Sequence, residues 1–100
     1  MGKVKLENVD KDLKQELKNP EFRKHFQIER VKVALAQKIA ELREDLGLNQ
    51  SALAKRMHVS QQFISQIETG ERNNLTIETL EKIAMATHTK LNIDFQSSHS

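Results

Sequence analysis

The chain has 100 residues, of which 37% are hydrophobic and 30% charged, with no Cys and a formal net charge of +2. This size suits one small domain with a single hydrophobic core, and the lack of Cys excludes disulfides and thiolate metal sites. A pI near 9.0 is too mildly basic to indicate nucleic-acid binding by itself. No apolar run has the length of a signal peptide or a membrane span, so we expect a cytoplasmic protein without membrane contacts.

A short helix is predicted over residues 10–18, because Val9, Leu13 and Leu17 recur at intervals of four. Two helical turns are too short to be stable alone, so another surface must cover this apolar side.

A long helix is predicted next, since Asn19-Pro20-Glu21 is a strong helix start and Gly47 supplies the matching end. It carries two apolar stripes on roughly opposite sides: Ile28, Val31, Leu35, Ile39, Leu42 and Leu46 on one, and Phe22, Phe26, Val33 and Ala40 on the other. One helix cannot bury both stripes in its own core. Either the short helix folds back over the second stripe, or a partner protein binds a surface made of Leu13, Leu17, Phe22 and Phe26.

Residues 50–69 predict two short amphipathic helices joined by a turn. Their apolar positions recur at helical spacing and form the expected buried set: Leu53, Ala54, Met57, Val59, Ile64 and Ile67. The second helix turns Gln61, Gln62, Ser65 and Gln66 outward. A surface helix is usually solvated by Lys and Glu, whereas an amide can both donate and accept at a base edge. The second helix is therefore predicted to be a DNA-recognition helix.

A further helix is predicted to open at Thr76, with Ile77, Leu80, Ile83 and Ala84 on its apolar face. Beyond His88 the period changes, because Leu91, Ile93 and Phe95 alternate with polar residues as in a strand. Such a strand needs a partner for its ladder, which could be the N-terminal segment, a second copy or another protein.

The central residues resemble the Cro/repressor-type (XRE) helix-turn-helix family over about residues 39–88. The resemblance is carried by Gly47-Leu48-Asn49-Gln50, Leu53-Ala54, Ser60-Gln61-Gln62, Ile64, Ile67-Glu68 and Gly70. It implies an all-α chain: a five-helix lambda-repressor-like helix-turn-helix domain over residues 28–89, an N-terminal helical extension over 1–27 serving as a partner-binding arm, and a short β-strand with a polar tail over 90–100. In this family the second helix of the motif lies in the major groove.

Site residues follow from the same resemblance and from the outward face of the second helix. The base-reading residues are expected to be Gln61, Gln62, Ser65 and Gln66, and the phosphate-contacting residues Asn49, Gln50, Ser60, Arg72, Asn73, Asn74 and Lys55. Lys55 could equally just solvate its helix. Phe63 could contact a thymine methyl or pack at the helix edge. Arg43 and Glu68 match a structural pair of the family, and His58 replaces the Gly common in the turn, which predicts slight backbone strain.

A double-stranded, palindromic operator with adenine in each half-site is the expected partner, because Gln can bond both N7 and N6 of adenine. Few cations in residues 47–75 are available for phosphate, so we expect a homodimer reading half-sites roughly 34–36 Å apart. Pairing would use Leu91, Ile93 and Phe95, or a helical interface. The same three residues could instead form a strand with a partner protein.

No catalytic, metal or cofactor constellation is expected. Ser51 and Lys55 lie on a solvated helix surface without an oxyanion site, the four His residues are scattered, and the carboxylates Glu41, Glu44 and Asp45 fall on a polar helix side.

The flanking segments resemble those of HigA-type antitoxins, on the blocks Asn19-Pro20-Glu21-Phe22-Arg23-Lys24 and Lys90-Leu91-Asn92-Ile93-Asp94-Phe95. That resemblance implies a type II antitoxin that neutralises a toxin, commonly a ribonuclease, and represses its own operon as a dimer. HipB-type antitoxins, whose partner is a kinase, also have a terminal strand. The alternatives are a stand-alone phage-type or chromosomal repressor, and a protein-interaction adaptor that uses the fold without reading DNA.

Overall fold

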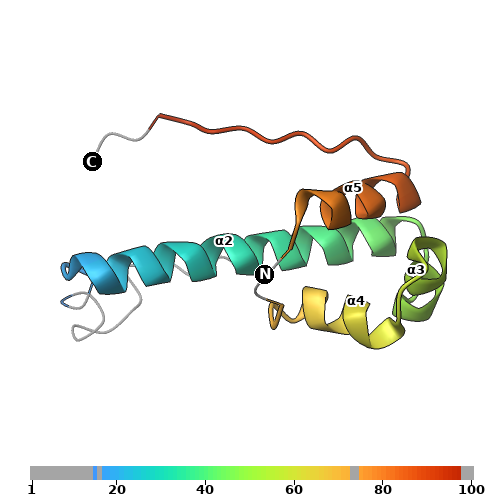
Figure 1. The fold of residues 1–100 in the computed structure, drawn as a ribbon, viewed down its shortest axis with the longest axis horizontal. Helices are drawn as coiled ribbons and strands as arrows, with labels where there is room; N and C mark the ends of the chain where they lie inside the picture. Colours follow the sequence, from blue (N-terminus) through green and yellow to red (C-terminus); the bar gives the residue numbers. More distant parts are fainter. Residues whose placement is uncertain (1–14, 16, 73–74, 98–100) are drawn as a thin grey trace. The chain divides into compact units, whose positions relative to one another are not determined.

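The computed structural model describes residues 15, 17–72 and 75–97, and these contain four helices and no strand (Figure 1). The helices are α2 (Pro20–Asp45), α3 (Gln50–Met57), α4 (Gln61–Glu68) and α5 (Ile77–Ala86). The all-α class is therefore confirmed, whereas the expected five helices and C-terminal strand are not supported. None of the helices in the described part of the chain is long and apolar enough to cross a membrane.

The predicted helix over residues 10–18 lies outside the described residues except near its end. There Leu17 and Lys18 form a turn, in which the Lys18 N–H donates to the Gln15 carbonyl at 3.1 Å. Leu13 lies outside the described residues, and Leu17 is half-buried.

α2 begins where the sequence predicts. The Asn19 side chain accepts from the Glu21 backbone N–H at 2.9 Å, and Pro20 takes the first helical position, where no N–H is needed. Residue contacts divide the chain into two units, residues 1–34 and 35–100, and the boundary falls within α2. In the first unit Phe22 and Phe26 are half-buried, and their stacked ring centroids lie 6.4 Å apart.

The first apolar stripe is covered only in its middle, and Leu46, just past the end of α2, is 40% exposed. Ile39 is buried and Leu35 and Leu42 pack against the core, but Ile28 is 49% and Val31 65% exposed. Val33, on the other stripe, is 50% exposed. The apolar surface of this helix therefore extends beyond the core that the described residues form.

The core of the second unit lies among α2, α3, α4 and α5, with α3 packed against both α4 and α5. Its buried cluster comprises Ile39, Leu53, Ala54, Met57, Ile64, Ile67 and Ile83, and Val59, Phe63 and Leu80 are among the partly buried residues around it. Every member of the buried set predicted for residues 50–69 is therefore in this core or packed against it. This packing fixes α3 and α4, since eight-residue helices are not stable alone in water.

All four helices end in the same backbone arrangement. In each, the first or second residue after the helix has a left-handed backbone, with φ between 56° and 78°: Gly47, His58, Gly70 and His88. The next N–H bonds back to a carbonyl five residues earlier, as from Val59 to Ala54 at 3.0 Å and from Thr89 to Ala84 at 2.9 Å. At His58 the expected left-handed turn is present with a Cβ, so this position carries backbone strain that Gly would not.

The C-terminal segment does not form the predicted strand. After α5 the chain runs as an extended trace without an arrow (Figure 1), and Ile93 and Phe95 are 56% and 94% exposed. The alternation of apolar residues is real, but within the described residues no other segment pairs with its backbone groups, and a strand requires such a partner.

Candidate nucleic-acid interface

α3 and α4 are both opened by a polar side chain that caps the helix. The Asn49 side chain accepts from the Ala52 N–H at 2.8 Å, and the Ser60 hydroxyl accepts from the Phe63 N–H at 3.0 Å. Each satisfies one of the N–H groups that a helix start leaves unpaired. Asn49 and Ser60 are predicted to contact phosphate, and the structure adds this capping role, whose sequence signal is a polar residue just before an apolar period.

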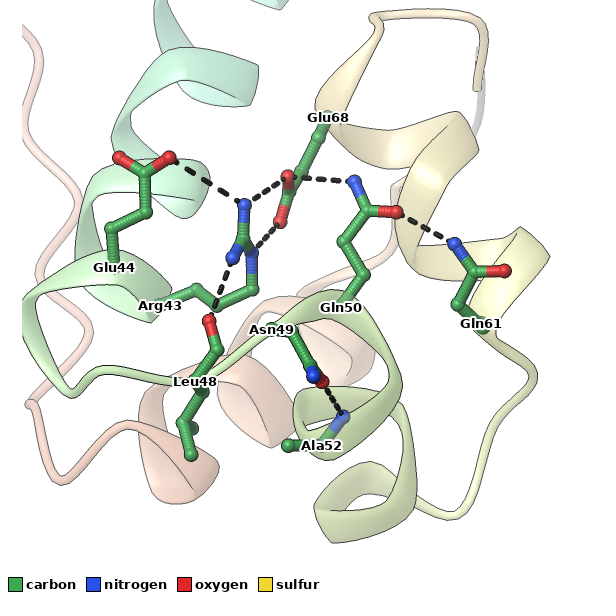
Figure 2. Close-up of polar contacts among 8 residues, drawn as sticks. All are labelled: Arg43, Glu44, Leu48, Asn49, Gln50, Ala52, Gln61 and Glu68. Atoms are coloured by element: carbon green, nitrogen blue, oxygen red, sulfur yellow. Dashed lines mark hydrogen bonds and ion pairs between the residues drawn. The ribbon is translucent and has the colours of Figure 1, made fainter.

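A chain of polar contacts joins the ends of three helices (Figure 2). Arg43, in the last turn of α2, forms a bidentate pair with Glu68 at the end of α4: Nε lies 2.7 Å from Oε2, and Nη2 lies 3.0 Å from Oε1. Its Nη1 donates to the Leu48 carbonyl at 2.7 Å. Glu44 adds a longer ion pair at 3.7 Å. The guanidinium thus ties α4 to the end of α2 and to the loop before α3.

Gln50 extends this network to the start of α4. Its Nε2 donates to Glu68 Oε1 at 3.0 Å, and its Oε1 accepts from Gln61 Nε2 at 2.7 Å. Figure 2 shows the Gln50 amide lying between the other two side chains. Gln50 opens α3 as expected, but its amide is engaged within the protein, so in this state it positions Gln61.

The Arg43 and Glu68 side chains are largely buried, 12% and 7% exposed, and their charges stabilise each other. Burial alone would raise the pKa of the Glu68 carboxyl, but the hydrogen bonds from Arg43 and Gln50 and the Arg43 charge outweigh it, so the pKa is lowered. The hydrogen bond to Glu68 raises the pKa of Arg43. Both groups are therefore ionised at neutral pH, and the pair acts structurally.

The outward face of α4 carries amides and a hydroxyl. Gln61 and Gln62 are exposed at the first turn, and Ser65 and Gln66 are half-buried further along. Glu68 is the single charged residue of α4, and it forms an ion pair with Arg43. The four predicted base-reading residues thus share one helix, and its first turn presents two uncharged groups that can donate and accept.

The predicted phosphate-contacting residues have different surroundings. Lys55 is exposed on α3. Arg72 lies with its guanidinium carbon 4.4 Å from the centroid of the Phe63 ring. Asn73 and Asn74 lie outside the described residues. Phe63 itself is half-buried against the core, which agrees with the packing interpretation.

Two further contacts were not anticipated. Arg56 donates from Nη1 to the Ala86 carbonyl at the end of α5, at 3.0 Å, where a cation is favourable. Neither this contact nor the stack of Arg72 on Phe63 has a local sequence signal, because each depends on how the elements pack. No group of three or more His, Asp or Glu side chains able to hold a metal occurs within residues 15, 17–72 and 75–97.

Two short packed helices, joined by a tight turn and presenting uncharged amides from the second, define a helix-turn-helix protein. The chain belongs to the helix-turn-helix family HTH_3, whose model matches residues 39–93, more than half of its length. It is a DNA-binding transcription regulator.

Among solved structures the chain is similar to the restriction-modification controller protein C.AhdI from Aeromonas hydrophila, with a TM-score of 0.58 and 27% sequence identity. The match covers 62% of this chain and 88% of that protein. No curated protein sequence matches significantly.

Proposed function

We propose that this protein is a sequence-specific transcriptional repressor that acts on DNA in the cytoplasm and reads adenine-bearing half-sites with α4. The observation that carries the proposal is the pair of exposed amides at the first turn of α4, where Gln61 is held by Gln50 at 2.7 Å. The N-terminal residues of a recognition helix are those that reach base edges.

The bond to Gln50 is compatible with base reading. The Gln61 amide nitrogen has two hydrogens, so one can remain on Gln50 while the other donates to N7 of adenine. The Gln61 carbonyl oxygen can then accept from N6. Such a bidentate contact discriminates against other bases by about 1–3 kcal/mol. Ser65 and Gln66 are proposed to contact bases further along the groove, and Asn49, Gln50, Ser60 and Lys55 to lie near the DNA backbone.

We propose a homodimer, because one copy offers few uncommitted cations to DNA. Arg43 and Arg56 are bonded within the protein, at 2.7 Å to Glu68 and 3.0 Å to Ala86. Two copies would double the phosphate contacts and read a palindrome. The exposed Ile77 and Met85 of α5, and the segment with Leu91, Ile93 and Phe95, are the candidate interfaces. A monomeric mass at micromolar concentration without DNA would contradict this.

The test is selection from a randomised duplex pool at stated salt. The native protein is expected to enrich a palindrome with adenine in each half-site, and the Gln61→Ala/Gln62→Ala variant is expected to enrich nothing. The matched control is Gln27→Ala/Gln37→Ala, which makes the same change at two exposed positions of α2 and should leave the enrichment intact. No enrichment, or the same weak enrichment by the native protein and the α4 variant, would refute base reading by these amides and favour the adaptor alternative.

A toxin-neutralising role is the second part of the proposal. It is supported by the resemblance of both flanking segments to HigA-type antitoxins and by the exposed apolar residues Ile28, Val31 and Val33 on α2, next along the helix to Phe22 and Phe26. Surfaces of this kind commonly bind another protein. The proposed partner is a ribonuclease toxin, with a kinase as the less favoured choice.

This role is tested by expressing the product of any small adjacent gene with and without this protein. Three results together would support neutralisation. The native chain should rescue growth, Phe22→Asp and Phe26→Asp should each abolish the rescue, and the exposed control Gln27→Asp should retain it. If folded Phe22→Asp and Phe26→Asp variants still rescued growth, this surface would be abandoned. The similarity to a restriction-modification controller protein favours the alternative of a regulator without a toxin partner, which a neighbouring methyltransferase or endonuclease gene would support.

A further inference from the structure

The stack of Arg72 on Phe63 lies beside the recognition helix and is not used by the base-reading scheme. The Arg72 guanidinium carbon is 4.4 Å from the Phe63 ring centroid, within the range of a cation–π contact. The Phe63 ring is itself half-buried against the core, so it offers a fixed platform. The backbone holds Arg72 as well, because the carbonyl of Gln66 accepts from the N–H groups of Glu71 at 2.9 Å and Arg72 at 3.3 Å.

Within the residues that the structure describes, the Arg72 guanidinium donates no hydrogen bond to the protein. Its Nε is buried and has no hydrogen-bond partner in the described part of the chain, which also contains no ion pair to this residue. By contrast, Arg43 is paired with Glu68, and Arg56 with the Ala86 carbonyl. A fixed cation without an acidic partner is suited to bind an anion from outside the molecule.

The position of Arg72 indicates which anion this is. The residue follows the C-terminal end of α4 and lies outside the set of α4 residues proposed to read bases. Residues that flank a recognition helix commonly contact the sugar-phosphate backbone. A guanidinium whose orientation is already fixed loses less side-chain freedom when it binds phosphate.

We propose that Phe63 is a positioning residue for DNA binding: its ring fixes the Arg72 guanidinium as an anchor for one backbone phosphate. The proposal rests on the proposed function, since it assumes that α4 enters the major groove.

The test measures affinity and its salt dependence for the duplex enriched by the native protein and for a scrambled duplex of equal length. The variants are Phe63→Leu, Arg72→Ala and their combination, with Phe63→Tyr as the variant that keeps the ring. We expect Phe63→Leu and Arg72→Ala each to weaken binding to both duplexes about tenfold. The combination should be no weaker than Arg72→Ala alone, and Phe63→Tyr should bind as the native protein does.

Salt dependence separates anchoring from a general packing defect. Arg72→Ala should lower the slope of log affinity against log salt by about one per protomer, which loss of packing alone would not do. If Phe63→Leu also lowers the thermal midpoint, two other results still test the anchor. These are the affinity of Phe63→Tyr and whether the affinity losses of Phe63→Leu and Arg72→Ala add in the double variant. Additive losses, an unchanged slope for Arg72→Ala, or native affinity for Phe63→Leu would each overturn the anchor while leaving the proposed function intact. Failure of the native protein to bind any duplex would overturn both.

Discussion

The amide nitrogen of Gln61 lies 2.7 Å from the amide oxygen of Gln50, so the first residue of α4 is bonded to the first residue of α3. These two residues are 11 apart in sequence, and each opens its helix. An exposed glutamine normally samples many rotamers, and ordering it on a base costs conformational entropy. The bond therefore orients the first amide of α4 before DNA is present.

Replacing Gln50 should test this orientation. We expect Gln50→Ala to weaken discrimination at the adenine beneath Gln61 about tenfold, and also to lower the thermal midpoint, because the Glu68 carboxylate loses a hydrogen bond. The measurement is competition between the enriched duplex and one with that adenine replaced. Lys55→Ala, an exposed change on the same helix, serves as the control and should lower affinity for both duplexes alike, or for neither. Unaltered discrimination in Gln50→Ala would mean that the bond has no part in recognition.

The Arg43–Glu68 pair gives a second prediction, in which the double change costs less stability than either single change. Removing either partner leaves a charge in surroundings where the side chains are 12% and 7% exposed, so Arg43→Met or Glu68→Leu should cost about 3 kcal/mol of unfolding free energy. The double variant should recover most of that loss, because two apolar side chains need no charge partner. Urea denaturation of all three variants measures this.

DNA binding by that double variant should nevertheless remain impaired. Gln50 loses the Glu68 oxygen to which it donates at 3.0 Å, and with it one of the contacts that hold the amide toward Gln61. A double variant with native stability and native base discrimination would show that the pair contributes stability only.

The lowered pKa of Glu68 predicts how stability responds to acid. A carboxyl whose pKa is lower in the folded state contributes stability that is present above its unfolded pKa of about 4.3 and is lost as pH falls through the folded value. The Arg43 pKa is raised, so its contribution is present below the unfolded pKa and would be lost only in strong alkali. Unfolding free energy measured from about pH 6 downward should therefore fall less steeply in Glu68→Gln than in the native protein. The exposed Glu81→Gln should follow the native curve, and identical curves for all three would rule out this linkage.

The left-handed residue between α3 and α4 yields a stabilising substitution. His58 has φ of 58° and an exposed side chain, so His58→Gly should remove backbone strain and raise the unfolding free energy by about 0.5–1 kcal/mol. Gly70→Ala is the reverse experiment at φ of 78°. A Cβ there would meet nothing within 4 Å, so its expected cost of about 1 kcal/mol comes from the backbone alone. Destabilisation by His58→Gly would indicate that the imidazole contributes an interaction of its own.

The core and the helix starts could be predicted from the sequence because they depend on local signals. The three-to-four residue spacing of Leu53, Met57, Ile64 and Ile67 identifies the buried faces, and the structure buries all four. Asn19-Pro20 locates the start of α2 within a residue. These signals need no knowledge of how distant parts of the chain pack.

The remaining features depend on contacts between distant segments, which the local sequence pattern does not specify. The alternation of Leu91, Ile93 and Phe95 satisfies the period of a strand, but no period supplies the second strand that a ladder requires. The contacts from Gln50 to Gln61 and from Arg72 to Phe63 depend on the angle between α3 and α4 and on the path of the loop after α4. The roles proposed for individual residues at DNA remain predictions.

The shortness of the two motif helices determines how destabilising mutations will affect DNA binding by this protein. At eight residues each, α3 and α4 have no helical stability apart from the shared core, so they form and melt together. A destabilising change in that core, such as Leu53→Ala, lowers the fraction of molecules that are folded. It leaves the DNA-contacting surface of the folded molecules unchanged. Such variants should bind their operator with native sequence preference but at lower occupancy. In a cell they would therefore resemble a reduced gene dose, whereas Gln61→Ala/Gln62→Ala is expected to remove sequence recognition from every folded molecule.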